Sequence, residues 1–398
     1  MRMNAVLSNP KHPEYGQFTV PLPIPHNQYD GIMEALNAMD MGDPLARDCQ
    51  MDEILGEYPI LKRLEGKPVN IDELDYLAKR LDSFDVGEAA QFQAMAEKLN
   101  LIDMKDLINL TFCCQQATVI TDFSDLEAIG RDHYMNLHGG CASTQELENL
   151  DGEETAVLLI DGGKGTVTRY GVVYDNGMQL SQLYDGKHLP CYHYEADMTA
   201  VGISTRWEPE NSRNVTWIYL PASKGQIERA MQRSGITDPK DMCLWIADSS
   251  FPEEVDFRCD NIHELNELAL AVEKFSIHDR KKLGAAVSMA KPENASQIRR
   301  LAENMDLFEF APGAHTPEEY GKYMIQRSGH FEYDPNLDEF YDYERYGLQH
   351  MDYQSGVFTD RGYIAYDAEK LRCGKGSQRG LDEKRSGFTE VRKQKNEE

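Results

Sequence analysis

A short stretch that occurs twice decides the fold of this chain. Asn70-Ile-Asp-Glu-Leu-Asp-Tyr-Leu-Ala78 resembles Asn261-Ile-His-Glu-Leu-Asn-Glu-Leu-Ala269, which lies 191 residues further on. Seven of fifteen positions agree between residues 70–84 and 261–275. The same offset pairs three glycines, without any gap, with three others: Gly130 with Gly321, Gly165 with Gly356 and Gly171 with Gly362. Self-similarity at a fixed spacing predicts two copies of one domain-sized unit.

The repeated stretch has the pattern of an amphipathic helix. Asn70 and Asn261 are each followed three residues later by Glu, which is typical of a helix start. Apolar residues then recur at helical spacing. Upstream, each copy has a short β-like segment that ends at a proline (17–22 and 215–220), then a helix (28–39 and 224–233). Further helices are predicted at 87–98, 104–115, 126–135, 278–290, 295–304 and 317–326, and each copy ends in a hairpin signal.

The predicted fold class is therefore α+β, with two tandem repeats of a small unit that combines β segments, a helical bundle and a β-hairpin in an elongated, multi-domain chain. We expect a first repeat at 1–195, a polar linker at 196–214, a second repeat at 215–367 and a basic, disordered tail at 368–398.

Composition excludes several classes of protein. The 398 residues carry a net charge of −27, so the chain repels nucleic acid and acidic lipid surfaces and favours basic partners. No apolar run approaches the roughly 20 residues of a membrane span, and no signal peptide is apparent. The eight cysteines form no C-x-x-C pair. We expect a reduced, cytoplasmic protein.

Local motifs for chemistry are weak. His188-x-x-Cys191-x-His193 has metal-ligand residue types, but it supplies at most three of the four ligands of a closed zinc site, so a loop is the preferred interpretation. Asp161-Gly-Gly-Lys-Gly-Thr166 lacks the spacing of a phosphate loop. We therefore expect no enzyme, no metal and no cofactor.

The most informative feature of the sequence is a cluster of acidic residues, and such a cluster occurs more than once. Residues 332–344 contain six carboxylates and no base, interleaved with Tyr and Phe, and residues 146–154 repeat the theme. Further acids occur at Asp248, Glu253, Glu254 and Asp256. A solvated acidic face is the plain alternative. Because closely spaced like charges repel, their retention suggests a use, and their separation is comparable with that of successive phosphates of one DNA strand.

Residues 316–329, 340–347 and 356–366 together resemble the ArdA antirestriction family: an acidic helix that ends in Gly, a Tyr-Asp-Tyr-x-x-Tyr motif, and Gly-x-Phe followed by Gly-Tyr-Ile. The resemblance implies a non-enzymatic DNA mimic, carried by a mobile genetic element such as a conjugative transposon, that binds the methyltransferase core of type I restriction-modification enzymes, without binding nucleic acid or membranes itself. The acids expected to contact the partner are Glu318, Glu319, Asp334, Asp338, Glu339, Asp342, Glu344 and Asp352 in the second copy, and Glu146, Glu148, Asp151, Glu153 and Glu154 in the first.

This chain departs from the family pattern in two ways. It carries two copies where the family has one, which leaves a homodimer and a covalent pseudo-dimer both open. Leu348-Gln349 stands where the family often has an Arg-Asp pair. Two other functions remain as alternatives: an acidic scaffold protein with another basic partner, and a hydrolase that uses Asp338 and Asp342 as paired carboxylates.

Overall fold

The computed structural model describes residues 3–192, 199–208, 214–248, 261–329 and 332–366. The predicted tail, His193 and the acids at 253–256 lie outside these ranges. Contacts divide the chain into two compact units, Met1–Asp248 and Ser249–Glu398, and each is described by itself. This boundary differs from the expected linker at 196–214.

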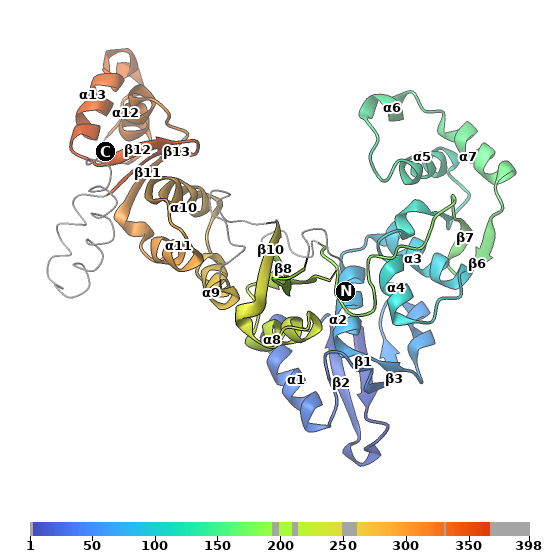
Figure 1. The fold of residues 1–398 in the computed structure, drawn as a ribbon. Coiled ribbons are helices and arrows are strands. Elements are labelled where there is room, and N and C mark those ends of the chain that lie inside the picture. Colours follow the sequence, from blue (N-terminus) through green and yellow to red (C-terminus); the bar gives the residue numbers. More distant parts are fainter. Residues whose placement is uncertain (1–2, 193–198, 209–213, 249–260, 330–331, 367–398) are drawn as a thin grey trace. The chain divides into compact units, whose positions relative to one another are not determined.

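Unit 1 begins with an antiparallel sheet of order β2-β1-β3-β4 (Figure 1). Its strands are β1 (Met3–Ser8), β2 (Gln17–Leu22), β3 (Cys49–Leu55) and β4 (Pro68–Val69), and α1 (Tyr29–Ala38) follows β2. Burial alternates along β1, where Met3, Ala5 and Leu7 face the core. Period-two burial of this kind is what a strand with one solvated face requires.

Three helices pack next to this sheet: α2 (Ile71–Asp82), α3 (Val86–Lys98) and α4 (Met104–Leu110). The predicted start of α2 is confirmed, because the Asn70 side chain accepts hydrogen bonds from the backbone N–H groups of Asp72 and Glu73. The predicted apolar face of α2 is confirmed too, since Leu74, Leu77 and Leu81 are buried.

A second β-helical part follows in unit 1. It contains α5 (Leu126–Leu137), α6 (Thr144–Glu148), α7 (Gly152–Gly162) and a sheet of order β5-β7-β6, formed by Thr118–Ile120, Gly171–Tyr174 and Thr166–Thr168 respectively. The hairpin β6–β7 was predicted, whereas its partner strand β5 was not.

Unit 1 ends with a three-stranded sheet of order β10-β8-β9. It consists of β8 (Thr199–Thr205), β9 (Thr216–Leu220) and β10 (Met242–Asp248), and α8 (Lys224–Arg233) connects β9 to β10. Strand β8 lies within the range that was expected to be a linker. Its residues from Thr199 to Ser204 are buried, and the strand lies between β10 and β9. This position explains why a short run of small and β-branched residues forms a central strand.

Helix α8 is fixed to the first part of the chain by two arginines. Arg229 Nε donates to Asp72 Oδ1 over 2.8 Å, and Arg233 Nε donates to Asp72 Oδ2 over 3.2 Å. Arg233 is buried and also donates to the Asn70 side chain. A buried charge is stable only when it is paired and hydrogen-bonded, so these contacts hold α8 against the start of α2.

Unit 2 begins with α9 (Ile262–Val272), α10 (Ile277–Ala290) and α11 (Ala295–Ala302). A sheet of order β11-β13-β12 follows, formed by Phe308–Pro312, Gly362–Tyr366 and Gly356–Thr359 respectively, together with α12 (Pro317–Gln326) and α13 (Tyr343–Asp352). Short 3-10 helices occupy Pro13–Tyr15, His26–Gln28, Pro59–Leu64 (η3), Cys114–Gln116, Pro239–Asp241, Met305–Leu307 and Pro335–Phe340 (η7).

Elements β1 to β7 follow one another in nearly the same order as β8 to β13. Each series has three strands around a helix, then three helices, then a strand, a crossed helix pair and a hairpin, and the first series has β4 and α6 in addition. The sheet orders β2-β1-β3 and β9-β8-β10 correspond. The mixed α+β class is confirmed. That the two series are copies of one fold stays a prediction. Within the described ranges, none of the helices is long and apolar enough to cross a membrane.

Candidate functional site

Negative charge is gathered in two segments. Residues 118–175, here called the first acidic module, hold 11 acidic and 3 basic side chains, a net charge of −8. Residues 308–366, the second acidic module, hold 11 acidic and 4 basic side chains, a net charge of −7. Together they carry −15 of the total −27, in fewer than a third of the residues. Each module consists of a three-stranded sheet and a helix pair (Figure 1).

The helix pair of the second acidic module is held close by two glycines. A Cβ atom on Gly321 would lie 2.0 Å from the backbone oxygen of Tyr343, and one on Gly347 would lie 1.9 Å from that of Pro317. Helices α12 and α13 therefore cross with their backbones in contact. No residue with a side chain fits at either position unless the helices separate.

Helices α5 and α7 of the first acidic module cross in the same way. A Cβ atom on Gly130 would lie 1.9 Å from the backbone oxygen of Gly152. Gly130 and Gly321 are one of the glycine pairs found in the sequence. The pair Gly171 and Gly362 has the same role in both hairpins, with φ values of 131° and 134° that favour glycine.

All thirteen predicted acids lie on the surface, and only Asp338 is half-buried. Six of them have a hydrogen-bonded role within their own module: Asp334, Asp338, Glu319 and Asp342 in the second, and Glu146 and Asp151 in the first.

Most of these six cap a helix. Asp342 accepts from the backbone N–H of Arg345 over 3.0 Å at the start of α13, and Asp151 accepts from that of Glu154 over 2.9 Å at the start of α7. Glu319 and Glu146 complete capping boxes at α12 and α6. These carboxylates stabilise helix starts, so their presence alone does not require a partner.

The other seven predicted acids have no side-chain hydrogen bond or ion pair within the described residues. They are Glu318, Glu339, Glu344 and Asp352 in the second acidic module, and Glu148, Glu153 and Glu154 in the first.

At the offset of 191 residues, exposed acids of the two modules form three pairs: Glu148 corresponds to Glu339, Glu153 to Glu344, and Asp161 to Asp352. Asp161, which is not among the acids predicted to contact the partner, is exposed at the end of α7. The repeat offset was the signal that would have found it. We call the six residues of these three pairs (Glu148, Glu153, Asp161, Glu339, Glu344 and Asp352) the paired acids.

Asp338 is a fixed carboxylate. Its Oδ1 atom accepts from the Tyr333 hydroxyl over 2.6 Å, from Gln326 Nε2 over 2.8 Å, and from the Tyr343 hydroxyl. The hydrogen bonds from Tyr333 and Tyr343 lower the pKa of Asp338 below its ordinary value of 3.8. The group is thus ionised and oriented at neutral pH. Because these donors come from three separate segments of the chain, the network could not be predicted from residue spacing alone.

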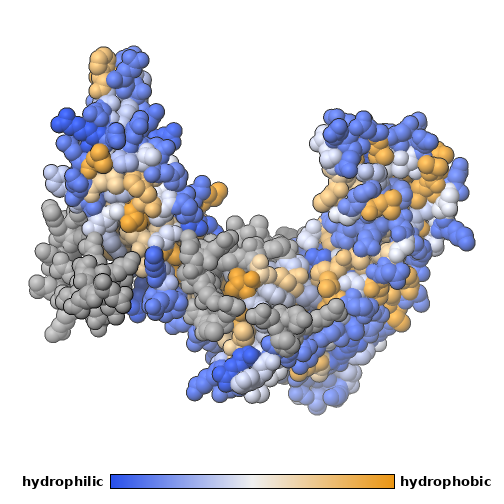
Figure 2. Space-filling model, turned by 45° about the horizontal axis from the view of Figure 1, so that its top comes forward, coloured by the Kyte–Doolittle hydropathy of each residue, from blue (hydrophilic) through white to orange (hydrophobic). Residues whose placement is uncertain are grey.

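The most exposed aromatic side chains of the two modules lie in the second acidic module, whereas Phe123 of the first is 48% exposed. Phe340 is 81% exposed and Tyr353 is 84% exposed. At the offset of 191 residues, Asn149 and Leu150 stand where the second module has Phe340 and Tyr341. Figure 2 shows a face of the molecule that is mostly hydrophilic, with apolar residues in small separate patches.

The other sequence candidates do not come together as sites. His188 Nδ1 lies 2.6 Å from Asp185 Oδ2, so this histidine has a polar partner within its own loop. His193 lies outside the described residues. Among the described residues, no group of three or more His, Cys, Asp and Glu side chains is arranged to hold a metal ion. Asp338 and Asp342, the pair that a hydrolase would need, are engaged in the tyrosine network and in the helix cap respectively.

The fold and the two modules define an acidic α+β protein whose exposed carboxylates are carried on glycine-crossed helix pairs. Residues 212–365, which make up less than half of the chain, match the family described as antirestriction protein (ArdA). The match includes β9, α8 and β10 of unit 1 and the whole second acidic module up to Ala365. A search of curated proteins found no match to the chain.

Proposed function

We propose that the protein is a non-catalytic antirestriction protein that acts as an acidic mimic of DNA. It would occupy the DNA-binding groove of a type I restriction-modification enzyme, at its methyltransferase core. The family match at 212–365 supports the antirestriction role. The paired acids carry the proposal for the mechanism, because both modules keep unbonded, exposed carboxylates at the same positions.

The arrangement of the paired acids suits a phosphate mimic. Helices α7 and α13 each carry two of them eight residues apart, Glu153 with Asp161 and Glu344 with Asp352. At 1.5 Å per residue they are spaced by about 12 Å along the helix axis. One DNA strand spans that distance with three to four phosphates, at about 3.4 Å each. Basic side chains that contact phosphates three to four steps apart on one strand would therefore meet carboxylates at a comparable spacing.

The amount of charge limits how much DNA is imitated. The two modules together carry −15, which equals the charge of roughly 25 Å of duplex at one charge per about 1.7 Å. Charge of this size attracts a basic groove over a short stretch, and contacts of another kind must supply the rest of the affinity. The exposed aromatic side chains of the second acidic module are suited to that role, since aromatic residues are the usual anchors of interfaces.

The first acidic module lies outside the family match, and we infer that it is a second mimic of the same kind. It shares the crossed helices, the hairpin and three paired acids with the second module. A chain with two mimics would act as a covalent pseudo-dimer. The contacts of Arg229 and Arg233 with Asp72 would then hold parts of both copies together.

A DNA-cleavage assay with a purified type I enzyme tests the proposal. The variant Glu339→Lys, Glu344→Lys, Asp352→Lys should lose inhibition by ten-fold or more, because like charges placed across an interface cost several kcal/mol. The matched control is Glu34→Lys, Glu273→Lys, Glu293→Lys. It makes the same change in net charge at exposed acids outside both modules, which have no side-chain partner in the described part of the chain.

The control should retain inhibition. Full inhibition by the first variant would remove the second acidic module from the interface. Equal loss in both variants would indicate that only net charge matters, which favours an acidic protein with another basic partner.

A further inference from the structure

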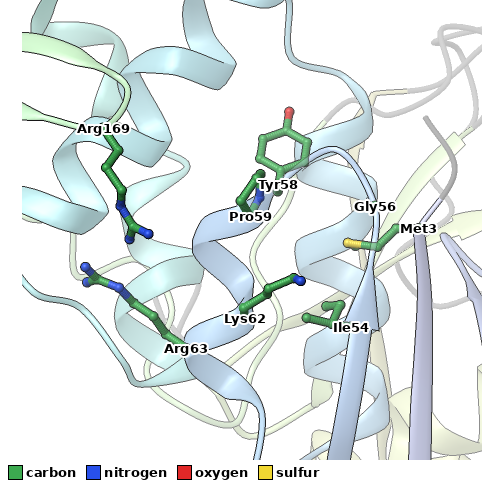
Figure 3. A pocket seen from close by; sticks show the side chains of 8 residues that line it. All are labelled: Met3, Ile54, Gly56, Tyr58, Pro59, Lys62, Arg63 and Arg169. Atoms are coloured by element: carbon green, nitrogen blue, oxygen red, sulfur yellow. The ribbon is translucent and has the colours of Figure 1, made fainter.

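One cavity of unit 1 differs from the rest of this acidic chain in its charge. It has a volume of about 490 Å³ and is lined by Met3, Ile54, Gly56, Tyr58, Pro59, Lys62, Arg63 and Arg169. Three of these side chains are cationic and none is acidic. The cavity lies where the end of β3 and the 3-10 helix η3 meet the turn between β6 and β7 (Figure 3). A local excess of cations in a chain of net charge −27 calls for an explanation.

The two arginines are held in place by groups outside the cavity. Arg169 Nε donates to Glu97 Oε1 over 3.1 Å, and its backbone N–H donates to Glu97 Oε2 over 3.1 Å. Arg63 Nη1 donates to the backbone oxygen of Ala96 over 3.2 Å, and its Nη2 lies 4.0 Å from Glu97 Oε1. One carboxylate therefore orients both guanidinium groups, which would otherwise repel each other.

This arrangement leaves hydrogen-bond donors free. Within the described residues, neither terminal nitrogen of Arg169 has a partner, and neither has Lys62 Nζ. Figure 3 shows the guanidinium groups of Arg63 and Arg169 turned toward the same space, while the Lys62 amine extends toward Met3 and Ile54. Fixed guanidinium groups with free terminal nitrogens match the oxygens of a phosphate group in a bidentate manner.

The other side of the cavity is apolar. Met3, Ile54 and Tyr58 are buried core residues whose surfaces reach the cavity, next to Pro59. A volume of about 490 Å³ is within the range of about 300 to 1,000 Å³ that is usual for sites of organic ligands. An inorganic anion alone would leave most of this space and all of the apolar wall unused.

We propose that this cavity binds a mononucleotide or a similar organic phosphate. The phosphate would lie between the guanidinium groups of Arg63 and Arg169, and the flat ring would lie against Met3, Ile54 and Pro59, close to the Lys62 amine. The inference does not rest on the antirestriction function: Arg169 belongs to the first acidic module but is not one of the paired acids, and the other residues that line the cavity lie outside both modules.

Calorimetric titration of the full-length protein tests the proposal. The probes are AMP, adenosine and inorganic phosphate, at about 0.1 M salt, where charges more than roughly 10 Å away are screened. AMP should bind at least ten-fold more tightly than either of its parts. The variant Lys62→Ala, Arg169→Ala should bind AMP at least ten-fold more weakly, because charge-assisted hydrogen bonds are lost.

The chain offers a matched control for this variant. Lys164→Ala also removes an exposed cation close to the same hairpin, but Lys164 does not line the cavity, so AMP affinity should stay unchanged. Lys62 and Arg169 are both exposed, so the fold should survive, and circular dichroism checks this. Three results would each overturn the proposal: no heat with AMP, an unchanged affinity in the double variant, or phosphate that binds as tightly as AMP.

Discussion

The two acidic modules have the same plan and carry nearly the same charge, but they present different surfaces. Both cross two helices at glycine, close on a hairpin with a positive-φ glycine, and expose the paired acids. Only the second adds Phe340 and the tyrosines around Asp338. In the first, the corresponding segment is the short helix α6, with Ser143 and Glu146 in its capping box.

This difference separates two properties that an inhibitor of a DNA-binding enzyme needs. Charge guides the association of the two proteins over about a Debye length, so the exact position of each acidic side chain matters little. Apolar anchors act only in contact and depend on shape. We infer that both modules contribute charge, and that the second acidic module contributes the specific anchor.

The largest effect is expected where a module depends on its glycines. Gly347→Ala should destabilise the second acidic module by about 3 kcal/mol or more, because the new Cβ atom would lie 1.9 Å from the Pro317 backbone oxygen. Gly130→Ala should do the same to the first module. Hydrogen exchange of the α12–α13 and α5–α7 amides would measure each loss separately.

Gly31→Ala is the control for this pair. Gly31 lies in α1, and a Cβ atom there would meet nothing within 4 Å. It should stabilise the protein by about 0.5 kcal/mol, as alanine favours helices. Unchanged exchange in the Gly347→Ala variant would mean that the helices are not in backbone contact.

Charge reversal compares the modules directly. Glu148→Lys, Glu153→Lys, Asp161→Lys should weaken inhibition of a type I enzyme by several-fold, and the corresponding second-module variant should weaken it by ten-fold or more, because only that module combines charge with an anchor. Dose–response curves of DNA cleavage give both values. A first-module variant that inhibits like the unaltered protein would restrict the site to the second acidic module.

A smaller effect is expected from the exposed aromatic side chain. Phe340→Ala should weaken inhibition about five- to ten-fold, because truncating an aromatic interface residue removes an apolar contact, without changing how inhibition depends on salt. Asn149→Ala, at the corresponding position of the first module, should have no effect. If both variants behave alike, the aromatic difference between the modules has no functional meaning.

The smallest effect concerns the fixed carboxylate. Asp338→Asn should lower the melting temperature slightly at pH 7, because the pKa of Asp338 is lowered in the folded state and its ionised form stabilises the fold. This contribution is complete above the ordinary pKa of 3.8 and is lost as the pH falls through the lowered value. The two melting curves should therefore converge only in strongly acid solution. A difference that stays constant below that pH would assign the effect to packing.

Sequence alone could predict most of the helices because their signals are local, but it did not predict α6, α7 or α13. The offset between 70–78 and 261–269, the Asn70 cap and the apolar face of α2 were all visible, and the structure confirms this cap and this face. The strands that were missed are β1, β3, β4, β5, β8, β10 and β11. Central strands such as β8 are buried on both faces, so they show no alternation of apolar and polar residues.

The acids could be predicted as exposed but not sorted by their role. Asp342 and Glu339 look alike in sequence, yet one caps α13 and the other has no side-chain bond within the described residues. The residues around Asp338 come together only in the folded module, because Gln326 and Tyr343 are 17 residues apart. Tertiary contacts of this kind leave no periodic trace in a sequence.

The central claim is that this protein takes the place of DNA, and a competition measurement tests it most directly. A labelled duplex bound to the methyltransferase core of a type I enzyme is titrated with the protein, and the fluorescence anisotropy of the DNA is followed. We predict that the DNA is fully displaced and that the protein's own affinity for the core falls as salt rises, because it replaces phosphates with carboxylates. A complex in which the core holds the DNA and the protein together would contradict the account.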